Sequence, residues 1–157
     1  MMSANTGAGE NAPRAERSAA RLAATQALYQ IEITGGDADE VIEEFIDHRF
    51  GADPETGNQG AHDEVFFKEL IHGVLSGQTE IDRILAASLA SGWSLARVDS
   101  ILRAMLRAAT FELKGRADVP VKVVIDEYVE LAKDFFDGEE PAFVNAVLDR
   151  LAREGRG

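Results

Sequence analysis

The chain of 157 residues contains no cysteine. This absence excludes a disulfide framework, a thiolate-bound metal and a cysteine nucleophile, and it is typical of proteins kept in a reducing cytoplasm. Long apolar runs are missing too, since no stretch approaches the roughly 18 residues of a membrane-spanning helix. The N-terminal sequence MMSANTGAGENAP has neither the basic start nor the apolar segment of a secretory signal. We therefore expect a cytoplasmic protein without a membrane span.

Residues that usually carry catalysis are few. The three histidines stand at positions 48, 62 and 72, and no two of them are spaced to share one helix face as metal ligands. Neither of the phosphate-binding glycine motifs, GxxxxGK[ST] or GxGxxG, is present. Acidic pairs such as Glu139-Glu140 are sequence neighbours, whose side chains diverge on a helix. We predict that the chain is not an enzyme and needs no metal or cofactor.

The negative charge of the chain is concentrated in one segment. The formal net charge is −12, and residues 36–64 hold ten acidic residues against a single basic one, Arg49. The rest of the chain is nearly balanced. A local basic surface is therefore compatible with the overall charge, and net charge alone does not exclude nucleic acid.

Hydrophobic periodicity predicts an all-α protein of about seven helices. Residues 1–13 are small and polar and are expected to form a disordered tail. The first helix is predicted over residues 14–33, ended by Gly35-Gly36, and a second over residues 39–50. The sequence GADPETGNQGAHD then predicts a loop. The third and fourth helices begin near Asp63 and after Gly77.

The fifth predicted helix, residues 95–113, is apolar on more than one side. A central helix that touches two bundles requires this distribution. Ser94 is the expected N-cap, and Trp93 is expected to pack on Val98 as a hydrophobic staple.

Two further amphipathic helices are predicted in residues 119–152, VPVKVVIDEYVELAKDFFDGEEPAFVNAVLDRLA. Pro120 and Pro141 suit the first turn of a helix, where the missing N–H costs nothing. Gly138 is expected to end the first of these helices in a left-handed conformation. Asn145 is a weak helix former inside the second helix, and capping, packing or a binding contact must explain it.

Basic residues follow one side of the first predicted helix. Arg14, Arg17 and Arg21 are spaced by three and four residues, so they can follow a phosphate backbone together. Thr25 and Tyr29 continue the line from Arg21. Basic residues beside a stackable ring are typical of surfaces that bind single-stranded RNA. The alternative is an exposed basic edge with Tyr29 packed on a neighbouring helix.

Several blocks, in order and at matching spacing, resemble the NusB family of bacterial transcription antitermination factors. The blocks are RLAATQALYQIE (21–32), FFKELIHGV (66–74), WSL (93–95), LRAATFEL (106–113) and the run 119–151. The resemblance covers most of residues 14–153 and implies one helical RNA-binding domain over residues 14–157. It is strongest in the ELAK and FVNAVLD segments.

The resemblance implies an all-helical fold of two small bundles that share the central helix. It implies binding to the boxA element of ribosomal RNA leaders, together with NusE, a small ribosomal subunit protein, within the antitermination complex of RNA polymerase. Family members are monomers or homodimers. The resemblance also implies which residues contact RNA. They lie on the first helix and in the last third of the chain, and they are Arg14, Arg17, Arg21, Tyr29, Lys133, Phe135, Glu139, Phe143 and Asn145.

Three departures from the family pattern bear on these surfaces. The N-terminal basic residues are spaced here, where the family often has consecutive ones. Ala142 stands where a lysine usually precedes the FVN triplet. Leu102 stands where the family often has an acid that is implicated in partner contact. The first two departures predict weaker electrostatic attraction to RNA.

The sequence leaves two alternative functions open. One is the helical RNA-binding domain that is fused to cytosine-5 ribosomal RNA methyltransferases and resembles the same fold. With no cysteine and no room for a cofactor-binding domain, such a chain would have to serve the enzyme in trans. The other is a protein-only scaffold that uses the acidic segment from Asp37 to Glu64.

Overall fold

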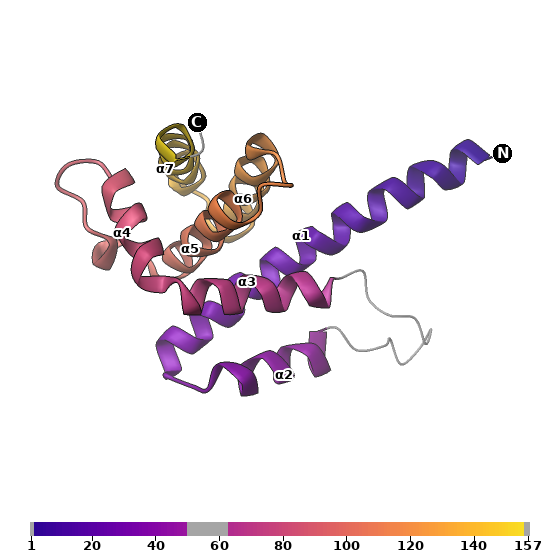
Figure 1. Ribbon diagram of the computed structural model, residues 1–157, viewed down its shortest axis with the longest axis horizontal. Coiled ribbons are helices and arrows are strands. Elements are labelled where there is room, and N and C mark those ends of the chain that lie inside the picture. Colours follow the sequence, from indigo (N-terminus) through magenta and orange to yellow (C-terminus); the bar gives the residue numbers. More distant parts are fainter. Residues whose placement is uncertain (1, 50–62, 156–157) are drawn as a thin grey trace. The chain divides into compact units, whose positions relative to one another are not determined.

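The computed structural model describes the backbone of residues 2–49 and 63–155 and the side chains of residues 13–48 and 63–154. These residues form α-helices and one short 3-10 helix, and none of them lies in a strand, so the predicted all-α class is confirmed (Figure 1). The predicted loop of residues 51–63 falls almost wholly outside the described part. The elements are α1 (Met2–Thr34), α2 (Ala38–Arg49), α3 (Glu64–Ser76), α4 (Gln78–Ser88), η1 (Leu95–Arg97), α5 (Ser100–Gly115), α6 (Val121–Phe135) and α7 (Glu140–Gly155).

The chain divides into two compact units, Met1–Ile71 and His72–Gly157, and the division falls inside α3. In the first unit α1 packs against α2. One face of α1, which carries Ala20, Ala23, Ala24 and Ala27 at steps of one to three residues, is buried. Phe45 of α2 meets Phe67 of α3 edge to face, with ring centroids 6.0 Å apart. Such an arrangement suits the opposite charges of ring face and ring edge.

Local sequence signals explain both the end of α1 and the beginning of α2. Gly35 has φ of +68° and donates its N–H to the carbonyl of Ile31 at 2.9 Å, so it ends α1 in a left-handed conformation. Asp37 caps α2, because its Oδ1 accepts the N–H of Asp39 at 2.8 Å.

The start of α1 differs from the prediction. The helix begins at Met2, whereas the sequence predicted a disordered tail over residues 1–13 and a start near Arg14. Elongation of an existing helix adds a hydrogen bond for each residue fixed, so a helix can extend into a weakly helix-forming segment. Among the described side chains, the first buried one is Ala20. The domain boundary at residue 13 therefore stays a prediction.

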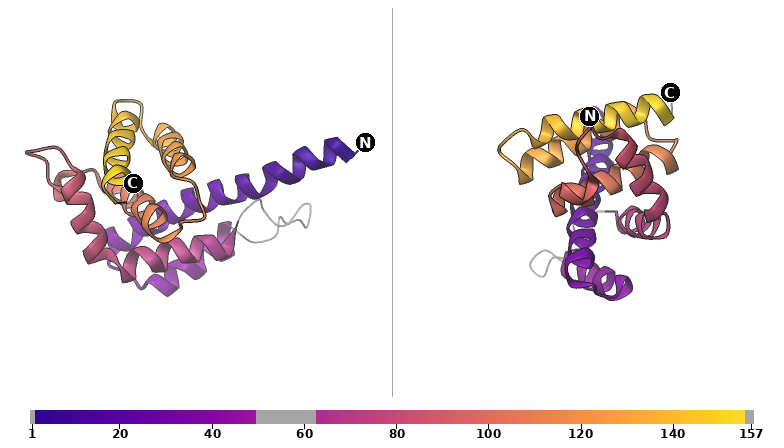
Figure 2. Two further views of the ribbon diagram at one scale, coloured as in Figure 1. Left: turned by 45° about the horizontal axis from the view of Figure 1, so that its top comes forward. Right: turned by 90° about the vertical axis from the view of Figure 1, so that its left-hand side faces the viewer.

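In the second unit α6 and α7 lie side by side, joined by the short connection 136–139 (Figure 2). Helix α5 packs on α4, α6 and α7. As predicted for the central helix, its buried residues cover more than one side, Leu102, Ala104, Met105, Leu106, Ala108, Ala109, Thr110, Glu112 and Leu113. No described helix combines the length and the apolar character needed to cross a membrane.

The beginning of α5 was predicted wrongly. Asp99, not Ser94, caps the helix, and its Oδ1 accepts the N–H groups of Ile101 and Leu102 at 2.9 and 3.3 Å. Ser94 makes no side-chain capping bond and instead precedes the separate 3-10 turn η1. Both residues are good N-caps, and sequence spacing alone does not decide between them. Trp93 is therefore not a staple of α5 and stays 56% exposed.

The turn between α6 and α7 also differs in detail. Gly138 was expected to be left-handed, but among the described residues only Gly35 and Gly92 have positive φ. Helix α6 ends at Phe135, and Phe136 follows in an extended conformation with its N–H bonded to the carbonyl of Ala132 at 2.9 Å. The chain thus leaves the helix before it reaches Gly138.

Candidate nucleic-acid interface

The three arginines predicted to follow a phosphate backbone lie in different environments. Arg14 is exposed, Arg17 is half-buried and Arg21 is only 3% exposed. The guanidinium carbons of Arg17 and Arg21 stand 5.7 and 5.2 Å from the centre of the Phe66 ring on α3. Both cations are thus within the range of a cation–π contact. The sequence predicted that all three arginines project together from one side of the helix. Arg21 does not, because its side chain packs between α1 and α3.

The surface charge of α1 comes from Arg14 and Arg17. Neither makes an ion pair with any other side chain that the structure describes. Farther along the helix Thr25 is fully buried, while Tyr29 is half-buried. This edge can offer unneutralised positive charge and a partly exposed aromatic ring.

In the second unit, a groove lies between the α4–α5 connection and the start of α7. Its volume is about 290 Å³. We call it the Trp93 groove, and its lining residues are Trp93, Arg97, Val98, Asp99, Leu102, Glu139, Glu140 and Phe143. The rings of Trp93 and Phe143 are 6.0 Å apart and tilted by 46°. The groove combines an aromatic wall with three carboxyl groups.

A second, more open hollow lies between α6 and α7. Its volume is about 600 Å³. We call it the α6–α7 hollow, and its lining residues are Asp126, Val129, Lys133, Phe136, Asp137, Gly138, Pro141, Ala142 and Asn145. Lys133 is exposed and pairs with Glu130 at 3.1 Å. Asn145 is exposed as well, so the interior of α7 tolerates it because its amide faces outward.

The predicted C-terminal residues are therefore divided between two surfaces. Glu139 and Phe143 line the Trp93 groove, whereas Lys133 and Asn145 line the α6–α7 hollow. Phe135 is half-buried, and its ring centroid lies 6.3 Å from that of Phe136.

Two positions at which the chain departs from the family pattern also lie on these surfaces. Leu102 is 5% exposed and supplies an apolar wall to the groove. With Asp99, Glu139 and Glu140 against one arginine, Arg97, the lining of that groove is acidic on balance. Ala142 is an exposed residue of the hollow and adds no charge there.

Trp93 is the residue that sequence reasoning missed. It was interpreted as a helix staple, but it is exposed and forms one wall of the groove against Phe143. The available signal was that the only tryptophan of the chain directly follows the turn-forming pair Ser91-Gly92. A large aromatic side chain left in water at such a place is typical of a binding surface.

The described residues contain no cluster of three or more His, Asp or Glu side chains that could hold a metal ion. The fold and these surfaces define the class of the molecule as an all-helical binding protein. Comparison with known proteins is more specific. The model of the NusB family matches residues 18–153, and the chain belongs to this family.

Relatives and solved structures agree with this assignment. Transcription antitermination protein NusB of Caulobacter vibrioides is 54% identical over 140 residues, which cover 89% of this chain and 94% of that protein. The structure of T. maritima NusB has a TM-score of 0.74 at 33% identity and covers 90% of this chain and 93% of that one. A chain from the crystal structure of antitermination factors NusB and NusE in complex with dsRNA has the same fold. Its TM-score is 0.71 at 24% identity, with 88% of this chain and 96% of that chain covered.

Proposed function

We propose that this protein is an RNA-binding transcription antitermination factor. It acts with NusE on boxA elements of ribosomal RNA transcripts, as part of the antitermination complex of RNA polymerase in the cytoplasm, and it carries out no catalysis. The observation that carries the proposal is the match to the NusB family over residues 18–153, since this range includes Arg21 and Tyr29 of α1, the Trp93 groove and the α6–α7 hollow.

The RNA side of the proposal uses the basic edge of α1 and the α6–α7 hollow. Arg14 and Arg17 supply positive charge that no described carboxylate neutralises, and Tyr29 supplies a stacking ring. In the hollow, which Asp126 and Asp137 also line, Lys133 can exchange its exposed ion pair with Glu130 for a phosphate, and the exposed Asn145 amide can bond a base edge. Arg21 is assigned a supporting role, because it is buried against Phe66.

Two further aromatic rings are assigned to base stacking in the proposal, and one of them, Phe143, also lines the Trp93 groove. Phe143 and Phe135 are both half-buried, so each keeps part of its ring available to a base. Base–aromatic stacking tolerates different sequences, since every base presents a π face. Sequence preference must therefore come from polar contacts, with Asn145 as the amide suited to this task.

The protein side of the proposal uses the Trp93 groove. Its three carboxyl groups outnumber the single arginine, Arg97. Asp99 is in part engaged as the cap of α5, so Glu139 and Glu140 are the groups that disfavour a phosphate backbone and favour a positively charged protein surface. Trp93 and Phe143 provide the apolar contact that anchors an interface. We therefore assign Glu139 to the boundary of the NusE contact, although the sequence pattern placed it along the RNA path.

Calorimetry tests the joint function directly. The affinity for NusE is measured with and without boxA RNA, and the affinity for boxA RNA with and without NusE. Coupling between two ligands is reciprocal, so both affinities must rise by the same factor. Equal NusE affinities with and without RNA would contradict a joint surface.

A scrambled RNA of equal length is the matched control for sequence preference. The proposal expects boxA RNA to bind more tightly than the scrambled sequence at the same salt concentration. Equal binding of both would leave only charge attraction, and no RNA binding at all would favour the protein scaffold.

A further inference from the structure

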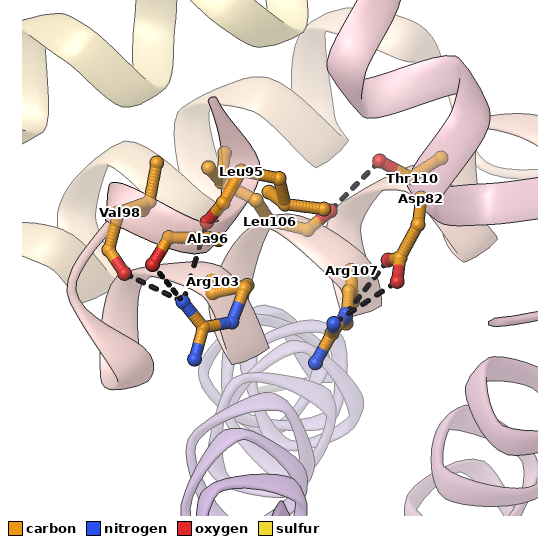
Figure 3. Close-up of polar contacts among 8 residues, drawn as sticks. All are labelled: Asp82, Leu95, Ala96, Val98, Arg103, Leu106, Arg107 and Thr110. Atoms are coloured by element: carbon orange, nitrogen blue, oxygen red, sulfur yellow. Dashed lines mark hydrogen bonds and ion pairs between the residues drawn. The ribbon is translucent and has the colours of Figure 1, made fainter. Parts of the chain in front are cut away.

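The segment that carries Trp93 is anchored by an arginine of α5. Nη1 of Arg103 donates to the carbonyl of Val98 at 2.7 Å and to that of Leu95 at 3.2 Å (Figure 3). The carbonyl of Ala96 lies at 3.5 Å from the same nitrogen. One guanidinium thus binds carbonyl groups of the 3-10 turn η1 and of Val98, which follows it, two to five residues after Trp93.

This anchoring has a clear physical reason. Within this short 3-10 turn the carbonyl of Leu95 accepts the N–H of Val98 at 3.1 Å, and Val98 itself is extended, so its own carbonyl continues no helical ladder. A guanidinium can donate several hydrogen bonds from one rigid plane, so a single side chain can hold several carbonyls at once. The next arginine of α5, Arg107, has a different task, since it pairs with Asp82 of α4 at 2.8 Å (Figure 3).

The other end of the segment is also held by an arginine. Nη1 of Arg150 on α7 donates to the carbonyl of Ser88, the last residue of α4, at 3.0 Å. Between these two anchors, the chain passes through Gly92 with φ of +89° and Trp93 at 56% exposure. The indole is therefore exposed, while the backbone on both sides of it is attached to α5 and α7.

We propose that Arg103 is a positioning residue for the Trp93 groove. It holds η1 so that Trp93 stays beside Phe143 and the groove is preformed before a protein partner arrives. A preformed surface avoids the ordering cost of its side chains on binding. This inference rests on the proposed function for its partner, NusE, but the position of Trp93 can be measured without any partner.

The test compares Arg103→Gln with Arg103→Lys, with Arg83→Gln as the matched control. Gln is neutral and has fewer donors, Lys keeps a cationic donor, and Arg83 is an exposed arginine of α4 outside the groove. Trp93 is the only tryptophan, so time-resolved fluorescence anisotropy with excitation selective for tryptophan reports on this one side chain. NusE affinity without RNA is measured on the same samples, below the thermal transition of each variant.

We expect Arg103→Gln to increase the local motion of Trp93 and to weaken NusE binding about 2- to 12-fold, the ordering cost of one side chain. Arg103→Lys should restore most of both values, and Arg83→Gln should change neither. Unchanged motion of Trp93 in folded Arg103→Gln would overturn the inference, as would increased motion with unchanged NusE affinity. If Arg103→Gln does not fold, the Lys variant decides, because it must then show a smaller change of the same kind. Absence of NusE binding by the unmodified protein would contradict the proposed function instead, while the anisotropy result would still be valid.

Discussion

The hydroxyl of Tyr128 on α6 donates a hydrogen bond of 2.6 Å to Oε2 of Glu112 on α5, and both side chains are fully buried. A buried carboxyl group needs polar partners, because burial without them costs several kcal/mol. The Tyr128 hydroxyl is such a partner, and its hydrogen bond joins α5 and α6, which pack on each other in the second unit.

Tyr128→Phe should therefore destabilise the protein by about 1–3 kcal/mol, since it leaves one oxygen of Glu112 without that donor at nearly constant volume. Urea denaturation followed by circular dichroism measures the free energy of unfolding. Tyr29→Phe is the matched control, because Tyr29 is only half-buried, and it should change stability little. Equal effects of the two changes would show that the Tyr128–Glu112 bond contributes nothing specific.

Gly73 permits close packing within the second unit. A Cβ at this position would lie 2.1 Å from Cε1 of Phe111. Gly73→Ala should therefore destabilise the protein by about 1–3 kcal/mol through overpacking, despite the better helix propensity of alanine.

The double variant Gly73→Ala with Phe111→Leu tests the cause. If the clash with the ring is responsible, the smaller leucine should relieve it, and the two costs should not add. Additive costs would locate the problem elsewhere than at Phe111.

Arg14 and Arg17 should account for part of the salt dependence of RNA binding. Each arginine that neutralises a phosphate of single-stranded RNA contributes about 0.7 to the log–log slope of affinity against salt. Arg14→Gln and Arg17→Gln should each reduce the slope by roughly that amount, in filter binding between about 50 and 200 mM salt. A slope that both variants leave unchanged would remove these residues from the RNA surface.

Arg21→Gln should behave differently from those two variants. Arg21 is buried against Phe66, so its loss should lower the thermal midpoint, while folded protein keeps the wild-type salt slope. A reduced salt slope with unchanged stability would instead place Arg21 directly on the RNA.

Tyr29 and Phe143 are tested by substitution with alanine. If the rings stack on bases, each change should cost about 1–3 kcal/mol of RNA binding. Phe143→Ala should in addition weaken NusE binding, because Phe143 also lines the Trp93 groove, whereas Tyr29→Ala should not. Loss of the folded state without a specific RNA defect would show that the ring serves packing alone.

The control variant Arg83→Gln should change the pKa of Glu80. The hydrogen bond of Arg83, with Nε 2.9 Å from Oε2 of Glu80, lowers the pKa of Glu80 from its ordinary value. Because the folded-state pKa is depressed, the stabilisation is present at neutral pH and is lost as the pH falls through that pKa. In Arg83→Gln the pKa of Glu80 should rise, as measured by NMR titration of its carboxyl carbon. Both side chains are exposed, so global stability should hardly change.

Periodicity determined the helices of this protein because the residues that need burial recur every three or four positions. The alanines of α1 are buried as the pattern predicts, and α5 is buried on more than one side. The resemblance of ordered blocks also pointed to the NusB family, and the match over residues 18–153 confirms it. These features depend on spacing along the chain, which a sequence displays directly.

Tertiary packing decided what the individual side chains do. Arg21 has the same spacing as Arg14 and Arg17 but is buried, because Phe66 of a distant helix offers it a ring face. The choice of Asp99 over Ser94 as the cap of α5 is a local one that capping propensity leaves open, and Arg103 holds the intervening turn from the following helix. Trp93 is consequently a wall of a groove rather than a staple. The sequence by itself determined the helices and the family, whereas contacts between residues distant along the chain determined which side chains remain available for binding.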